Sequence, residues 1–162
     1  MRSSILAIPA LCLAACAVSA EAPPCPECLS CPEVEVPPPS PPARVLAAAE
    51  AEVRWAPSGK ARLTGGVTGA NAFVATLWMA PGAKVPSHRD PTEEYIHVLA
   101  GSGSITIDGV EHAIGPGDTV FMPAEAEVSY VNGTEPLTAL QVFAGPEPAD
   151  KYRTWTPKPP PP

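Results

Sequence analysis

The sequence predicts an all-β domain of the barrel or sandwich type, and three observations carry this prediction. Short apolar runs of strand length recur between residues 73 and 143. Turn residues separate these runs, at Pro81-Gly82, Asp108-Gly109 and Pro116-Gly117-Asp118. About 105 residues remain for folding once the two ends of the chain are set aside, which is enough for one hydrophobic core and too few for two.

Each expected strand has its own signal. Residues 73–79 are apolar and stop before the Pro81-Gly82 turn. Residues 104–107 alternate, and the Asp108-Gly109 pair that follows is the strongest hairpin signal in the chain. The next expected strands cover residues 119–122 and 137–143. Because strand edges must be paired or covered, we expect these strands to close into a jelly-roll barrel.

Alternation along the strands predicts which polar side chains meet. Successive side chains point to opposite faces of a strand, so His88 and Asp90 share one face and Arg89 takes the other. On the next strand, Glu94 shares a face with residues 96 and 98, and His97 lies on the opposite face. If Glu94 points inward beside His88 and Asp90, then His97 points outward and is a poor ligand candidate.

Two blocks of fixed spacing give this region a family resemblance. The first reads Gly82, five residues, His88, one residue, Asp90, three residues, Glu94, six residues, Gly101; the second reads Gly117, five residues, Pro123, one residue, Glu125, two residues, Val128, three residues, Asn132. They resemble the two motifs of the cupin superfamily, over roughly residues 52–155. The resemblance implies a cupin-type double-stranded β-helix with three histidines and one glutamate facing inward. Here Asp90 replaces the second histidine and Val128 the third.

The candidate metal ligands are His88, Asp90 and Glu94. One imidazole and two carboxylates form an oxygen-rich set that suits a divalent ion such as Mn²⁺, with iron, zinc and nickel as the other candidates. The alternative is that His88 and Asp90 only hydrogen-bond to each other, since buried polar groups need partners with or without a metal. A non-haem iron triad is rejected because it needs a later histidine, and His112 is the last in the chain.

Three more residues are candidates for the ligand pocket. Gln141 lies between Leu140 and Val142 in an apolar run, so its amide either reaches a polar partner in the cavity or faces outward on a half-exposed strand. Tyr130 and Asn132 share the strand face of Val128 and are secondary candidates.

The first fifteen residues predict a lipoprotein signal peptide. Arg2 precedes a short apolar run, and Leu13-Ala14-Ala15-Cys16 resembles a bacterial lipobox, which implies cleavage before Cys16 and lipidation of its thiol and amino group by fatty acids such as palmitate. The alternative is an ordinary secretory signal cut near Ser19-Ala20. Ala17 in place of an aspartate favours an outer-membrane lipoprotein that faces the periplasm and is held at the membrane by its acyl chains.

A cysteine-containing and proline-rich linker is expected over residues 16–42, as a disordered tether between the membrane and a barrel domain at 43–157. Cys25, Cys28 and Cys31 are disulfide candidates, because no fourth cysteine survives processing to complete a metal site and the periplasm is oxidising. Residues 43–53 are alanine-rich and predict a short helix or a frayed linker, and residues 158–162 form a proline-rich tail.

Composition limits the partners. The chain has 10 basic and 17 acidic residues, a net charge of −7, and it lacks a basic cluster, which argues against nucleic acid. The expected partners are the membrane, through the lipid anchor, and a small-molecule ligand, with outer strands available for a homodimer.

Three functions remain open at this stage. The first is a periplasm-facing cupin lipoprotein that binds a small polar ligand or a divalent cation in the barrel mouth without clear catalysis. The second is a cupin enzyme, an isomerase, lyase or dioxygenase, that uses a metal or acid–base chemistry at His88 or Glu94. The third is a structural or assembly protein of the envelope. Fold alone does not choose among them.

Overall fold

The computed structural model describes residues 41–157. The expected signal peptide, the lipidation site Cys16, the cysteines Cys25, Cys28 and Cys31 and the tail from residue 158 lie outside the described residues. Among residues 41–157 there is no helix with the length and apolarity that crossing a membrane requires.

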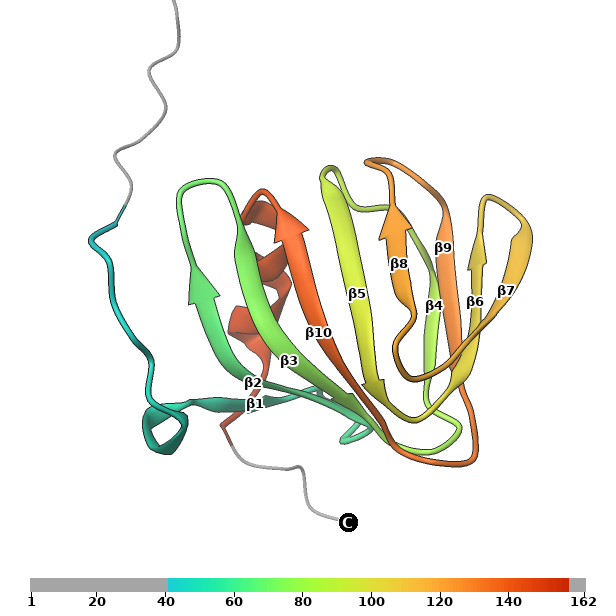
Figure 1. Cartoon of the computed structure of the whole chain (residues 1–162), viewed down its shortest axis with the longest axis horizontal. Coiled ribbons are helices and arrows are strands. Elements are labelled where there is room, and N and C mark those ends of the chain that lie inside the picture. Colours follow the sequence, from blue (N-terminus) through green and yellow to red (C-terminus); the bar gives the residue numbers. More distant parts are fainter. Residues whose placement is uncertain (1–40, 158–162) are drawn as a thin grey trace, which may run out of the picture. The chain divides into compact units, whose positions relative to one another are not determined.

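Ten strands form two antiparallel sheets in this part of the chain (Figure 1). The six-stranded sheet has the order β1-β2-β3-β10-β5-β8, with bounds Val53–Trp55, Ala61–Thr68, Phe73–Met79, Leu137–Ala144, Glu93–Ala100 and Thr119–Met122. The four-stranded sheet has the order β4-β9-β6-β7, with bounds Lys84–His88, Val128–Asn132, Gly103–Ile107 and Val110–Ile114. Two 3₁₀ segments, η1 (Ala48–Glu50) and η2 (Glu147–Thr154), flank the strands. The predicted jelly-roll architecture is therefore confirmed.

The hairpin predicted at Asp108-Gly109 joins β6 to β7. Both residues have positive φ, 47° and 83°, which is the left-handed geometry of the tight turns that match the twist of paired strands. Glycine adopts this geometry without strain, which explains why the dipeptide predicts the turn so well. Of the short helix or frayed linker expected over residues 43–53, the structure has only the three-residue 3₁₀ segment η1, and the chain enters β1 at Val53.

Two hydrophobic cores share the inner face of the six-stranded sheet. The first is covered by the four-stranded sheet and includes Val98, which is 1% exposed, and Leu137. The second includes Phe143, which is fully buried, and Tyr152 of η2. Figure 1 shows η2 behind β3 and β10, where the four-stranded sheet does not reach. The boundary between the two cores lies on β10 between Ala139 and Phe143.

Asn132, predicted as a pocket residue, instead fixes the turns at the end of the barrel. Its side-chain amide donates to the carbonyl oxygens of Ala80 at 2.8 Å and Glu135 at 3.0 Å, and more weakly to Met79 at 3.4 Å. Its own carbonyl oxygen accepts the Tyr130 hydroxyl at 2.9 Å. Asn132 is absent from the cavity lining described below.

Asn132→Ala is expected to lower the free energy of unfolding by about 2–3 kcal/mol, because it removes the amide hydrogen bonds to Ala80 and Glu135 and the buried acceptor of the Tyr130 hydroxyl. Urea denaturation measures the effect. The exposed Asn71 in the β2–β3 turn is the matched control, and its alanine variant should change stability by less than about 0.5 kcal/mol. Equal effects for the two variants would contradict this role.

Candidate metal centre and cavity

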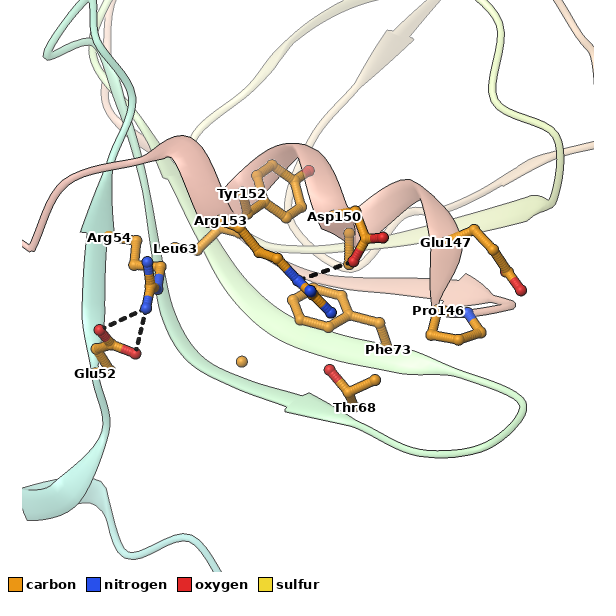
Figure 2. Close-up of a pocket in the computed structure, with 12 residues that line it drawn as sticks. Glu52, Arg54, Leu63, Thr68, Phe73, Pro146, Glu147, Asp150, Tyr152 and Arg153 are labelled. Atoms are coloured by element: carbon orange, nitrogen blue, oxygen red, sulfur yellow. Dashed lines mark hydrogen bonds and ion pairs between the residues drawn. The ribbon is translucent and has the colours of Figure 1, made fainter. Parts of the chain in front are cut away.

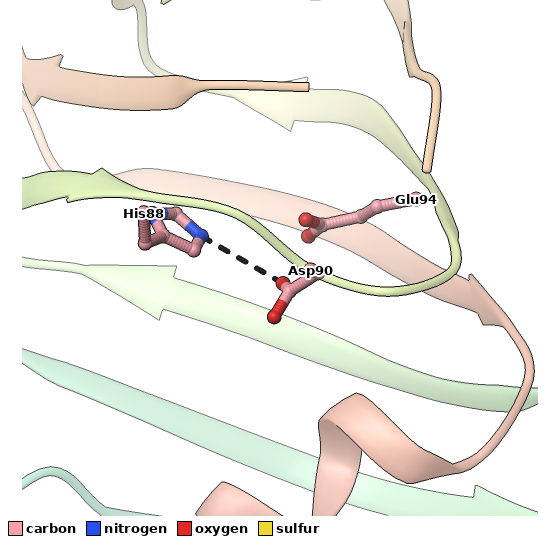
Figure 3. A group of neighbouring side chains, drawn as sticks. All are labelled: His88, Asp90 and Glu94. Carbon is pink, nitrogen blue, oxygen red and sulfur yellow. Dashed lines mark ion pairs between the residues drawn. The ribbon is translucent and has the colours of Figure 1, made fainter. Parts of the chain in front are cut away.

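The three predicted ligands come together where β4 leads into β5. His88 ends β4, Asp90 lies in the short connection, and Glu94 is the second residue of β5 (Figure 3). One ligand atom from each residue lies within 4.8 Å of the others, which is close enough for all three to contact one ion. The predicted alternation of side chains along β5 is also confirmed. Glu94, Ile96 and Val98 are buried, and His97 lies on the opposite face, with Nδ1 2.9 Å from the Thr119 hydroxyl.

The His88 ring is oriented by its own strand. Nδ1 is 3.0 Å from the carbonyl oxygen of Pro86, and because a carbonyl only accepts, Nδ1 carries the proton. In the neutral imidazole this leaves a lone pair on Nε2, which lies 3.7 Å from Asp90 Oδ2. A backbone partner that fixes the tautomer in this way is the usual arrangement of a metal-binding histidine.

Val128 stands beside His88 in the register of β4 and β9. It is buried and contributes to the cavity wall, so the position that carries the third histidine in the motif offers a hydrocarbon surface here. The donor set in this chain is therefore one nitrogen and two carboxylates.

Glu94 is only 8% exposed and is held by a buried chain of hydrogen bonds. The Gln141 amide donates to Glu94 Oε1 at 2.5 Å, and the Tyr152 hydroxyl donates to Gln141 Oε1 at 3.1 Å. Of the two orientations considered for Gln141, the inward one is therefore correct. Burial raises the pKa of the Glu94 carboxyl above its ordinary value of 4.5, although the Gln141 hydrogen bond and the Lys151 charge act in the opposite direction. Burial also raises the pKa of Tyr152, which keeps that phenol protonated as a donor.

Lys151 and Tyr152 were missed by the sequence analysis. The Lys151 ammonium lies 2.9 Å from Asp90 Oδ2 and 3.3 Å from Oδ1, and its charge lies over the rings of Phe143 and Tyr152 at 5.0 and 5.6 Å. The signal that could have found this segment is the aromatic pair Tyr152 and Trp155, spaced by three residues between two proline-containing stretches.

A cavity of about 500 Å³ opens at this cluster. Its polar residues include His88, Asp90, Glu94, Gln141 and Lys151. The rest of its wall is largely apolar and comes from both sheets: Leu77, Met79, Val85, Ile96, Ile105, Ile114, Met122, Val128, Tyr130 and Leu137. Tyr130, a secondary pocket candidate, therefore does line the cavity. An apolar chamber with a few convergent polar groups is the usual form of a small-molecule site.

A second pocket of about 360 Å³ lies between η2 and strands β1 to β3 (Figure 2). Four of its five charged residues form ion pairs, Arg54 with Glu52 at 2.9 Å and Arg153 with Asp150 at 3.0 Å, and the fifth is Glu147. None of the residues predicted for the site lines it, and its satisfied, exposed ion pairs give it no distinct chemistry.

Comparison with known proteins agrees with this geometry. Residues 76–143 match the model of the cupin domain family. An RmlC-like cupin from Shewanella frigidimarina superposes with a TM-score of 0.56 at 18% identity, covering 64% of this chain and 91% of that chain. Oxalate decarboxylase from Bacillus subtilis gives a TM-score of 0.57 at 18% identity, covering 66% of this chain and 30% of that one. At these identities the two structures establish the fold alone. The described domain therefore has the cupin fold, and its residues 76–143 match the cupin domain family.

A curated relative matches at higher identity over a shorter stretch. Dimethylsulfoniopropionate lyase DddW from Ruegeria pomeroyi is 41% identical over 64 residues, which cover 40% of this chain and 42% of that protein. The match thus spans about two fifths of the length of that lyase.

Glu94 is expected to make the cation-free protein less stable as pH rises. Because its pKa is raised on folding, the folded state binds more protons than the unfolded chain above pH 4.5, until the folded-state pKa is passed. The contribution of Glu94 to the free energy of unfolding is therefore fully present below pH 4.5. It is lost as the pH rises from 4.5 through the folded-state pKa of Glu94. Glu94→Gln keeps an oxygen for the Gln141 amide and cannot ionise, so its melting temperature in chelator should exceed that of the wild type at pH 8 and converge with it near pH 4. Parallel pH profiles would refute this account.

Proposed function

We propose that this chain is a divalent-cation-binding cupin that holds a small ligand in the cavity between its sheets. The observation that carries the proposal is the position of the three ligand atoms, within 4.8 Å of one another at a cavity of about 500 Å³. The donor set fits such an ion: Nε2 of His88 has its lone pair available, and two carboxylates supply negative charge. Mn²⁺ suits this mixture best, with iron, zinc and nickel as competitors.

The surrounding residues have separate roles in this proposal. Pro86 fixes the tautomer of His88, and Gln141 fixes the orientation of the Glu94 carboxylate. The apolar wall excludes water from the ligand and strengthens electrostatic interactions inside the cavity. A bound divalent ion supplies Lewis-acid polarisation of a ligand oxygen.

A thermal-shift measurement tests the cation site. Mn²⁺ at about a hundredfold excess over its Kd should stabilise the folded state by about 2.7 kcal/mol. For a domain of this size, that corresponds to a rise in melting temperature of roughly 10 °C. Mg²⁺, which prefers an all-oxygen octahedron, is the control and should give a smaller shift. Unchanged melting temperatures with manganese, iron, zinc and nickel salts would refute the proposal.

A second candidate is a lyase that acts by acid–base chemistry at Glu94, and the 41% identity to a dimethylsulfoniopropionate lyase favours it. Elimination from that substrate class removes a proton beside a carboxylate and releases a sulfide. The raised pKa of Glu94 makes its ionised form a stronger base than an ordinary carboxylate. Gas chromatography of dimethyl sulfide, with and without chelator, tests this function. Release that persists in chelator and disappears in Glu94→Gln supports it, and a rate equal to the protein-free control rules it out.

We further propose that the chain is anchored at Cys16 and faces the periplasm from the outer membrane. The lipobox resemblance and the proline-rich linker support this placement, which concerns residues outside the described part of the chain. Palmitate labelling of the wild type that is lost in Cys16→Ser would support it, and labelling of both proteins would contradict it. A homodimer through the outer strands remains a separate proposal, for which sedimentation gives the test.

A further inference from the structure

Lys151 already holds the carboxylate that a cation at the cluster would need. Its ammonium contacts both oxygens of Asp90, at 2.9 and 3.3 Å, and the Asp90 side chain is 16% exposed. It also acts electrostatically on Glu94, whose pKa its charge lowers. The positive charge of Lys151 therefore offsets negative charge in the cluster of His88, Asp90 and Glu94. Lys151 belongs to η2, which lies outside the residues that match the cupin family model.

A divalent ion and this ammonium would compete for the Asp90 carboxylate. An ion bound by His88, Asp90 and Glu94 takes at least one of the two oxygens that Lys151 now contacts. It also brings two positive charges within a few ångströms of a third, in a partly desolvated site where Coulomb repulsion is strong. Lys151 is able to leave, because its side chain is 41% exposed and projects from a short 3₁₀ segment.

The cavity indicates where the released ammonium would act. Lys60, Lys84, Arg89 and Lys151 all line it, although the chain as a whole carries a net charge of −7. Arg89 is already paired with Glu127 at 2.9 Å. Once Lys151 leaves Asp90, it remains at the cavity as a cation without a carboxylate partner, beside an apolar wall. That combination suits an anion with a short apolar body, such as a small carboxylate.

We propose that Lys151 and a divalent cation are alternative partners of Asp90, so that loading of the cation frees Lys151 to hold the anionic group of a small carboxylate ligand. This inference rests on the proposed cation site. It assigns to η2 a role in ligand capture that depends on the cation.

Calorimetric titration of the chelator-treated protein with MnCl₂ at pH 8 tests the exchange, using wild type, Lys151→Met and Lys151→Arg. Removing the competing charge should tighten Mn²⁺ binding by about tenfold or more in Lys151→Met. Lys151→Arg keeps the charge and should bind like the wild type. Tighter binding in Lys151→Met, including binding that appears only in this variant, supports the exchange. Equal or weaker binding in Lys151→Met overturns it while leaving the cation site intact, and lack of binding in all three proteins overturns both proposals.

Propionate tests the second half of the inference. With Mn²⁺ saturating, the wild type should bind propionate at least about fivefold more tightly than Lys151→Met, since the variant lacks the freed ammonium. Without Mn²⁺ this advantage should disappear, because Lys151 is then held by Asp90. Equal affinities of the two proteins in Mn²⁺, or no detectable propionate binding in either, would overturn the ligand role.

Discussion

His88→Ala is expected to lower the affinity for Mn²⁺ by more than about 100-fold. The substitution removes the nitrogen ligand of the proposed set and leaves only two carboxylates to hold the ion. Loss of residues that merely orient metal ligands weakens binding by 10–100-fold in comparable sites, so loss of a ligand should exceed that range. Titration calorimetry on chelator-treated protein measures the change.

His97→Ala is the matched control for this prediction. It removes the same type of side chain from β5, the next strand along the chain, on the face away from the cluster, where the ring contacts Thr119. We expect Mn²⁺ affinity to remain within about threefold of the wild type, as distant sites act independently. If the two alanine variants lost affinity equally, the cation would be binding elsewhere or through the general negative charge of the chain.

Phe143→Ala is expected to cost about 4 kcal/mol of folding free energy. The ring is fully buried in the second core and packs against Phe73 and Tyr152, with centroids 6.2 and 6.3 Å away. Truncation of a buried phenylalanine combines lost transfer free energy with a cavity that cannot fully collapse. Chemical denaturation measures the change.

Phe121→Ala supplies the comparison for the buried ring. Phe121 is 49% exposed on the outer face of β8 and packs against Tyr95, so its loss should change stability by less than about 1 kcal/mol. A small effect at Phe143 as well would mean that η2 contributes little to the fold, and the position of Lys151 and Tyr152 at the site would lose its structural basis.

Much of the site could be predicted because it depends on local geometry. The two-residue period of a strand places Glu94 inside and His97 outside whatever the rest of the fold does. Motif spacing likewise put Val128 at the position of the third histidine, and the strand register places it opposite His88. Gln141 could be recognised as a candidate because an amide in an apolar run needs a partner, although the sequence did not determine its direction.

The parts that escaped prediction depend on contacts between distant segments. Lys151 meets Asp90 across 61 residues of chain, and no local pattern specifies that encounter. Tyr152 closes the Glu94–Gln141 chain only because η2 covers the part of the six-stranded sheet that the second sheet leaves open. Asn132 lies on the same face of its strand as the pocket residue Tyr130. Its amide nevertheless donates hydrogen bonds to three nearby backbone carbonyl groups and not to a ligand in the cavity. In each case tertiary packing decides which partner a polar group finds.

Elemental mass spectrometry of the purified full-length chain, prepared without chelator or immobilised nickel, tests the central claim most directly. A cation centre at His88, Asp90 and Glu94 predicts about one equivalent of a divalent transition metal in the wild type, and its loss in His88→Ala. Absence of metal from both proteins, even after equilibration with manganese, iron, zinc and nickel salts, would contradict it. The cavity would then belong to a domain of cupin fold in which Lys151, and not a metal ion, neutralises the Asp90 carboxylate.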